Sequence, residues 1–255
     1  MCIFESQNLS SLALSYYDLM NRNKENKDVA ALFSKGMWVC KDNPLKQILI
    51  TGMNPSRKEK GECHISECSF RDCSGDYWDA MKSIMSESML CKVAYLDLFP
   101  IHEGKQIKAE DKLKIEIARE ILLITHKEIE RIAPSLLLIA NKRSAAYWGL
   151  YKWNWMDYDF GTRISDYDLP IEARGLGLDV YQIQGYKGNN DSIIVEESTS
   201  LAGTIAVNYG YHNLPYGSEK KGRRRPHTIS PEAFSALYDF AIQRKKSFNK
   251  CLKQR

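Results

Sequence analysis

The sequence predicts an α/β protein with a three-layer α/β/α arrangement, in which helices cover both sides of a mainly parallel central sheet of about four core strands. Short apolar runs alternate along the chain with segments of helical periodicity, which is the pattern of strand–helix–strand units. The runs are apolar throughout, as in strands that a parallel sheet buries on both faces. With 255 residues the chain can bury a large core. We expect a single domain over residues 1–255 with an insertion at about residues 151–200.

The first third of the chain predicts two helices and one strand. Residues 8–20 carry apolar side chains at helical spacing, and residues 29–33 allow a second helical turn. Residues 48–50 are a short apolar run that ends in a glycine- and proline-containing turn, which indicates a buried strand. The polar residues 57–75 are expected to form a long connection, a feature that is usually functional or disordered in compact domains.

The middle of the chain predicts two further strands around a long helix. Residues 93–96 and 136–139 are apolar runs of strand length. Between them, residues from about 109 to 131 form an amphipathic helical pattern, which Pro134 ends. Because all three apolar runs fit one parallel sheet, we expect residues 48–50, 93–96 and 136–139 to be neighbouring strands.

The last third begins with the expected insertion and returns to the core. Within residues 151–200 we predict short strands at 179–183 and 193–195. Residues 203–208 predict a fourth core strand. The final helix begins after Ser230, a good N-cap residue that is followed by a proline at the first helical position.

Composition limits the classes of function. The net charge of +4 permits a polyanionic partner without requiring one. No apolar run is long enough to span a membrane, and the first residues lack the pattern of a signal peptide. Seven unevenly spaced cysteines fit a reducing compartment better than a disulfide framework. We therefore expect a cytoplasmic monomer that does not bind membranes.

Three cysteines raise the question of a metal site. Cys63, Cys68 and Cys73 are spaced five residues apart, with His64 and Cys91 as candidate fourth ligands. The spacing lacks the close cysteine pairs that are typical of zinc sites. We expect reduced loop cysteines, and neither a metal nor another cofactor.

The turn after the first strand is the strongest candidate for a ligand site. Ligands of open parallel sheets bind at the carboxyl ends of the strands. Gly52 allows close approach of the backbone, and Pro55 stiffens the turn. Asn54 would then present a polar side chain at the mouth of a cleft. The alternative is an ordinary tight turn built from residues that favour turns.

The sequence GMNPS at residues 52–56 resembles the first motif of the uracil-DNA glycosylase superfamily, particularly its mismatch-specific and single-strand-selective branches. The resemblance implies a uracil-DNA-glycosylase-like fold and a DNA base glycosylase that flips a base and hydrolyses its N-glycosidic bond. In those branches the asparagine positions the attacking water, a role that falls here to Asn54. Gly52 and Met53 would line the base site.

Further motifs follow in the order of the family. Phe70 stands where the family places an aromatic side chain that stacks on the extruded base, and Tyr77–Trp78 resembles its aromatic pair. Asp97 occupies the position of an asparagine that reads the base edge. Asn141 follows the third strand, as a small polar turn does in the family, and the resemblance places it among the residues that bind the base. The alternative for Phe70 is a loop residue that packs on the core.

The last motif of the family has a weaker counterpart. His212 would stabilise the leaving base, although the proline spacing differs from the family pattern, and His227 is a second candidate for this role. The alternative for His212 is an ordinary histidine at the end of a strand.

A basic run follows the histidine motif. It suits phosphate contacts with single- or double-stranded DNA, and solvated surface is the alternative. Its members are Lys220, Lys221, Arg223, Arg224 and Arg225.

Two functions therefore remain from the sequence. The first is a DNA N-glycosylase, and the second is a non-catalytic nucleic-acid or nucleotide-binding protein on the same fold. Asp97 keeps the second open, because an ionised carboxylate can only accept hydrogen bonds whereas an amide can also donate them. We expect weak or absent activity on uracil at neutral pH, improved by Asp97→Asn. The alternative is that burial in a closed pocket raises the pKa of Asp97, so that the residue binds protonated and can still donate.

Overall fold

The computed structural model describes residues 9–41, 46–55, 65–102, 115–141, 143–150, 155–209 and 229–254. At its centre is a five-stranded sheet in the order β4–β2–β5–β9–β7. The strands are β2 (Ile48–Gly52), β4 (Val93–Asp97), β5 (Leu136–Ile139), β7 (Asp179–Gln182) and β9 (Ile205–Asn208). The first four in this spatial order are parallel, and β7 lies antiparallel to β9 at the edge. The predicted α/β class and the mainly parallel sheet are confirmed, and so is the adjacency of the first three strands.

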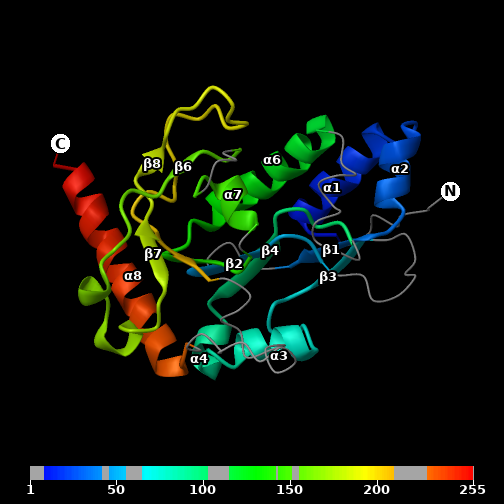
Figure 1. Cartoon of the computed structure of the whole chain (residues 1–255). Coiled ribbons are helices and arrows are strands. Elements are labelled where there is room, and N and C mark those ends of the chain that lie inside the picture. The colour runs from blue at the N-terminus through cyan, green and yellow to red at the C-terminus, as the bar shows by residue number, and fades with distance from the viewer. Residues whose placement is uncertain are drawn as a thin grey trace.

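Helices cover both faces of this sheet (Figure 1). One face carries α1 (Ser11–Arg22), α2 (Lys27–Phe33), α6 (Ile115–Ile132) and α7 (Ser144–Trp148). The other face carries α3 (Asp76–Lys82), α4 (Glu87–Leu90) and α8 (Pro231–Leu252). Successive strand residues point to opposite faces, so Leu49 packs in the first core whereas Ile48 and Ile50 pack in the second.

The helix boundaries follow from capping and amphipathicity. Ser10 caps α1 by accepting a hydrogen bond from the backbone N–H of Ala13 at 3.2 Å. Ser230 caps α8 through Ala233 in the same way, as the sequence predicts. The described part of α6 ends two residues before Pro134; residues 109–114 of the predicted helix lie outside the described residues.

The predicted long polar connection at residues 57–75 is partly wrong. It contains β3 (Ile65–Cys68), which pairs in parallel with β1 (Met37–Cys40). The sequence analysis predicts neither strand. The sequence of β3, Ile-Ser-Glu-Cys, has neither a continuous apolar run nor a regular alternation of apolar and polar residues. Met37 also bridges to Ile101 beyond β4, so the small sheet extends the side of the molecule that carries β4.

The region expected as an insertion contributes to the core. Its strand β7 forms the edge of the central sheet, and β6 (Tyr158–Asp159) pairs with β8 (Gly185–Tyr186) in a separate ribbon. Two short 3₁₀ helices, η1 (Asp166–Asp168) and η2 (Ile171–Ala173), precede β7. The prediction of a strand at 193–195 is wrong, because these described residues form no strand.

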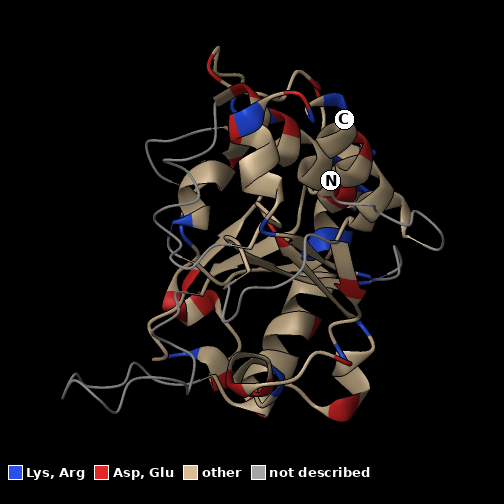
Figure 2. Cartoon of the chain, turned by 90° about the vertical axis from the view of Figure 1, so that its right-hand side faces the viewer, with Lys and Arg blue, Asp and Glu red and all other residues tan. Residues whose placement is uncertain are grey.

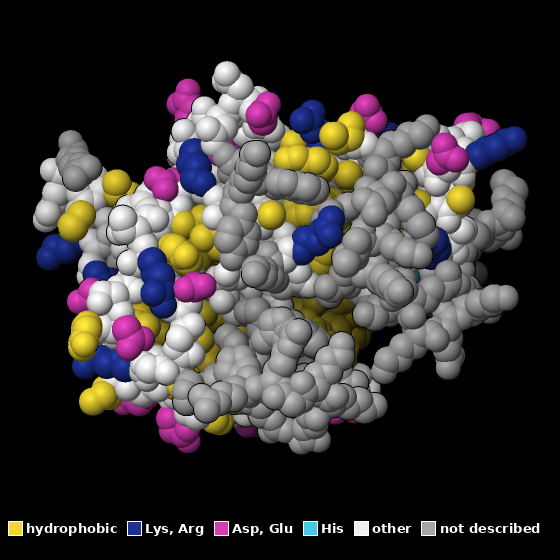
Figure 3. Space-filling model, in the orientation of Figure 1, with side chains coloured by type: hydrophobic (Ala, Val, Ile, Leu, Met, Phe, Trp, Pro, Cys, Tyr) yellow, Lys and Arg dark blue, Asp and Glu magenta, His cyan; other side chains and the backbone are white. Residues whose placement is uncertain are grey.

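The described surface carries mixed charge. Lys and Arg alternate with Asp and Glu over the helices (Figure 2). On the face shown in Figure 3, hydrophobic side chains are visible in separate patches. The large exposed apolar side chains among the described residues are Leu14, Ile115, Tyr167, Ile171, Val195 and Leu252. Within the described ranges, no helix combines the length and the apolar character needed to cross a bilayer.

Candidate active site at the carboxyl edge of the sheet

The parallel ladder between β2 and β4 places the two most informative motifs side by side. Gly52 pairs with Asp97 at the carboxyl end of the ladder. The segments that follow β2 and β4 stay paired beyond the end of the ladder, because the N–H of Phe99 donates to the carbonyl of Met53 at 2.9 Å. Asn54 follows at once. Two motifs that lie more than 40 residues apart in the sequence therefore share one edge of the sheet, where ligands of open parallel sheets bind.

Gly52 is required by close packing at this position. A Cβ atom there would overlap with Oδ1 of Asp97 and with the hydroxyl oxygen of Tyr95. The absence of a side chain therefore lets the Asp97 carboxyl group lie directly over the β2 backbone.

Asp97 is almost completely buried, with 6% of its surface exposed. Tyr95 lies two residues earlier on the same face of β4 and donates its hydroxyl hydrogen to Oδ1 of Asp97 at 3.0 Å. Burial raises the pKa of Asp97 to about 7, and the hydrogen bond from Tyr95 partly opposes this rise. The group therefore changes between a neutral acid and a carboxylate near neutral pH.

Tyr95 connects Asp97 to a partly exposed residue. The hydroxyl groups of Tyr77 and Tyr95 are 3.3 Å apart. Because Tyr95 uses its hydrogen for Asp97, its oxygen accepts from Tyr77 in this chain of hydrogen bonds. Burial, followed by the nearby Asp97, raises the pKa of Tyr95 well above its ordinary value, so Tyr95 stays a donor.

Asn54 has a buried polar atom to which no described residue donates. The residue is 5% exposed, and its side-chain N–H donates to the carbonyl of Pro55 at 3.4 Å. Its Oδ1 has no hydrogen-bond partner among the described residues. A buried acceptor that lacks a donor costs free energy, roughly 1–3 kcal/mol. A bound water or a ligand N–H at this atom would recover that cost.

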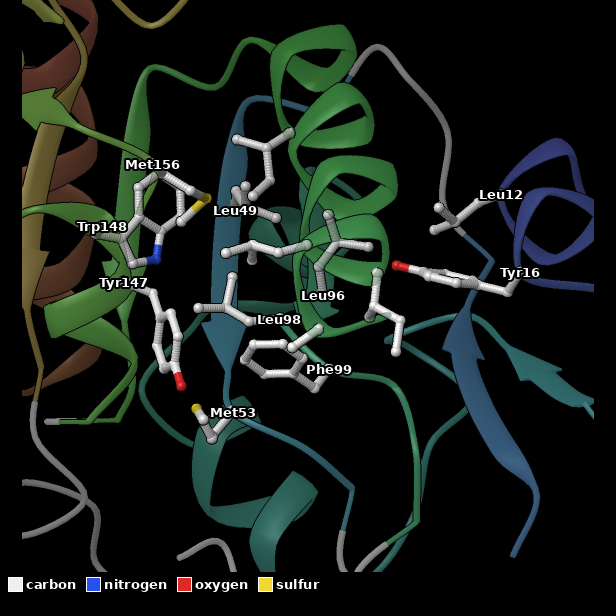
Figure 4. Close-up of a cluster of buried hydrophobic side chains, with 14 of the residues drawn as sticks. Leu12, Tyr16, Leu49, Met53, Leu96, Leu98, Phe99, Tyr147, Trp148 and Met156 are labelled. Carbon is white, nitrogen blue, oxygen red and sulfur yellow. The ribbon is translucent and has the colours of Figure 1, made fainter. Parts of the chain in front are cut away.

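Met53 does not lie on the same face as Asp97. Its side chain is 1% exposed and points toward Phe99 and Tyr147 in the core beneath α6 and α7 (Figure 4). Side chains of successive residues in an extended segment point to opposite faces of the sheet. Position 52 faces Asp97, so the side chain of Met53 points into the core on the other face. The side chain of Met53 therefore packs in the core, and a contact between this residue and a base stays a prediction.

Phe70 is also buried. It has no exposed surface and stacks on Tyr95 with ring centroids 6.4 Å apart. Trp78 packs edge-on against both rings. The partly exposed aromatic side chains around Tyr95 are Tyr77, Trp78 and Trp38.

Asn141 starts a helix. Its Oδ1 accepts from the backbone N–H groups of Arg143 at 2.8 Å and Ser144 at 3.4 Å. This is the geometry of a side chain that caps the first turn, here of α7. The side-chain oxygen of Asn141 is therefore engaged in local structure, and binding of a base by this residue stays a prediction.

The remaining predicted site residues lie outside the described residues. These are the histidine candidates His212 and His227 and the basic run Lys220, Lys221, Arg223, Arg224 and Arg225.

The cysteines do not form a metal site in the described part of the chain. Cys63 and His64 lie outside it, and Cys73 is buried with its thiol directed at the carbonyl of Ser69. Across the described ranges, no group of three or more His, Cys, Asp or Glu side chains is arranged to hold a metal ion.

Two residues of the site are not evident as site residues in the sequence. Tyr95 is predicted only as a strand residue, although a spacing of two from Asp97 puts both on one face of the strand. Trp38 belongs to a strand that the sequence does not reveal. Its indole lies 5.1 Å from that of Trp78, measured between ring centroids.

The sequence matches no protein-family model and no curated protein.

Proposed function

We propose that this protein is a DNA base glycosylase, which takes a base out of the nucleic acid and hydrolyses its N-glycosidic bond. The order of the motifs around Gly52, Phe70 and Asp97 resembles the uracil-DNA glycosylase superfamily, and a fold of that kind belongs to the proposal. An α/β domain with a mainly parallel sheet and polar residues at the carboxyl edge is compatible with it.

The proposed reaction adds water across the bond between the sugar C1′ and the base nitrogen. The bonding electrons leave with the base, and the sugar takes the hydroxyl group. Positive charge develops on the sugar and negative charge on the base, so a positioned water and donors to the base lower the barrier. Asn54 positions the water, and His212 donates to the leaving base.

The observation that supports this proposal best is the Oδ1 atom of Asn54, to which no described residue donates. It is buried at the carboxyl edge, close in sequence to the Gly52–Asp97 pair. An acceptor in this position can hold a water by one of its hydrogens and leave the water oxygen directed at a sugar. A turn that served only the fold would gain stability from a partner at this atom.

A second function is favoured by the aromatic residues. Phe70 is completely buried, so its ring is not open to a base in this structure. A non-catalytic protein that binds nucleotides or nucleic acid through Asp97 and the half-buried rings of Tyr77 and Trp78 would need neither Phe70 nor a nucleophilic water.

The decisive experiment measures strand cleavage after base loss. Labelled oligonucleotides carrying uracil, hypoxanthine, xanthine, guanine or a mismatch are incubated with the protein and then treated with alkali. We expect Asn54→Ala to lower the excision rate by at least ~10²-fold, because it removes the group that positions the water.

Asn54→Asp is the matched variant, because it keeps an acceptor oxygen at the same place. We expect it to retain excision within about tenfold of the parent, whereas a purely structural role would make it behave like Asn54→Ala. An unchanged rate in Asn54→Ala would remove Asn54 from the mechanism. Binding without excision by the parent would favour the second function.

A further inference from the structure

The described residues supply few hydrogen-bond donors to the acceptors at the carboxyl edge. Oδ1 of Asn54 has no partner among them, and Tyr95 is the hydrogen-bond partner that they provide for Asp97. Both Asn54 and Asp97 are more than nine-tenths buried. A ligand that is complementary to this edge therefore brings donors to it.

The donor from Tyr95 also orients the Asp97 carboxyl group. It occupies one lone pair of Oδ1, and Gly52 lets the group lie against the β2 backbone. Oδ2 and the second lone pair of Oδ1 can still accept. An ionised carboxylate held in this way offers two neighbouring acceptors and no donor.

We propose that the base bound at this edge presents a guanine-type edge, a ring N–H beside an exocyclic amino group, to Asp97. This inference rests on the proposed function, because it names the class of base for the same site. Tyr95 is the positioning residue that orients the carboxylate.

The edges of the bases decide between candidates. Guanine offers N1–H and its amino group side by side, which matches the two acceptors of a carboxylate. Hypoxanthine lacks the amino group and offers one donor. Uracil offers one donor between two carbonyl oxygens, and a carboxylate repels both of these. Cytosine and adenine offer an amino group beside a ring nitrogen that is itself an acceptor.

The carboxylate form is the one that selects this edge. Burial raises the pKa of Asp97 to about 7, so the group is mostly ionised at pH 8. The neighbouring titratable groups among the described residues are the phenols of Tyr95, Tyr77 and Tyr16. The nearby helix α3 adds the exposed carboxylates of Asp76 and Asp79.

The test is calorimetric titration of the full chain at pH 8 with five-nucleotide thymidine strands that carry guanine, hypoxanthine or uracil at the centre. The guanine and hypoxanthine strands have the same phosphates and differ by one amino group. We expect the guanine strand to bind at least about tenfold more tightly, since one hydrogen bond to a charged group is at stake.

The same titrations with the Asp97→Asn variant form the second part of the experiment. An amide supplies a donor as well as an acceptor, so the preference for guanine over hypoxanthine should fall below about threefold and uracil should bind better than in the parent. Asp79→Asn removes an exposed charge from α3 and should leave the preference unchanged.

The outcomes separate the two proposals. Equal or tighter binding of hypoxanthine or uracil by the parent overturns the guanine-type edge and leaves the base site standing. A preference for guanine that Asp97→Asn retains assigns it to another residue and also overturns the inference. If none of the strands binds, both the inference and the proposed function fail. The parent protein alone decides the first and third outcomes, so they do not depend on the folding of a variant.

Discussion

At the scale of residues, one carboxyl group links packing to chemistry. Asp97 is held over Gly52, receives a hydrogen bond from Tyr95 and is shielded from water. Shielding disfavours its charged form, so the folded protein binds a proton that the unfolded chain releases in the same pH range. The geometry that suits ligand binding therefore reduces stability when the site is empty.

We expect Asp97→Asn to stabilise the protein at pH 8 and to do so much less at pH 4.5. The folded pKa of about 7 lies above the ordinary value of 3.8, so the stability of the parent falls as pH rises between these values and stays lower above them. The gain at pH 8 should be roughly 2–4 kcal/mol, measured by denaturant unfolding at both pH values.

The exposed residue Asp79 provides the control for this measurement. Asp79→Asn removes a charge that is exposed to solvent. The free energy of unfolding should therefore change by no more than about 0.5 kcal/mol at both pH values. A stabilisation by Asp97→Asn that is the same at pH 4.5 and pH 8 would contradict the account of a buried, protonated carboxyl group.

At the scale of elements, α6 holds the 155–200 region through a second carboxylate. Glu130 accepts hydrogen bonds at Oε1 from the hydroxyl groups of Tyr158 at 2.7 Å and Tyr186 at 2.8 Å. Thr199 donates to the same oxygen, and the N–H and hydroxyl groups of Ser200 donate to Oε2. Burial favours the protonated form of Glu130, but these donors outweigh it and lower its pKa. One side chain thus joins a helix to the β6–β8 ribbon and to the segment before β9.

We expect Glu130→Gln to destabilise the protein by roughly 2–4 kcal/mol at pH 7, because an amide nitrogen would face donors that need an acceptor. Since the folded pKa is depressed, the stabilisation is present above the ordinary pKa and is lost as pH falls through the folded value. Denaturant unfolding of parent and variant between pH 7 and pH 3 should therefore show a difference that shrinks toward pH 3.

The same helix offers a control in Glu120, which pairs with Arg22 on the surface. Glu120→Gln should change the free energy of unfolding by less than about 1 kcal/mol. If both variants lower the free energy of unfolding equally, the hydrogen bonds of Glu130 stabilise the protein no more than a surface ion pair does.

His126 is buried and lies 3.6 Å from Glu130. Burial lowers the pKa of His126, so the protein also loses stability as pH falls below the ordinary pKa of histidine.

At the scale of the whole molecule, charge is spread over the described helices and concentrated in one run of the sequence. The net charge is +4, and the run from Lys220 to Arg225 carries five positive charges in six residues. DNA binding remains a prediction, and so does the monomeric state. Dependence on salt distinguishes phosphate contacts from solvated surface.

We expect replacement of Arg223, Arg224 and Arg225 by alanine to weaken DNA binding. The slope of log K against log salt should flatten by about one unit for each phosphate group that the protein no longer binds. Titrations at several salt concentrations with one oligonucleotide measure both quantities.

The matched control removes three positive charges from the exposed face of the last helix and its end, namely Lys246, Lys250 and Lys253. It changes the net charge equally and should leave the slope unchanged. If the two triple variants have the same slope, net charge rather than the basic run determines binding.

Local patterns in the sequence were enough to predict the α/β class and the turn at which the candidate site lies. Apolar runs such as residues 48–50 and 136–139 can be recognised locally, because strands that a sheet buries on both faces consist of apolar residues throughout. The capped start of α8 at Ser230 is local in the same sense. The turn at Gly52 and Asn54 was predicted because turn chemistry depends on a few adjacent residues.

Local patterns did not show which side chains face the candidate site, because this depends on contacts between distant segments. Met53 turns into the core because side chains alternate between the two faces along β2 and the residues that follow it. Phe70 is buried because its ring packs against Tyr95 and Trp78, which come from other segments of the chain. The pairing of β1 with β3 depends on contacts between segments that lie far apart in the sequence. The proton affinity of Asp97 follows from burial and from Tyr95, neither of which a linear pattern specifies.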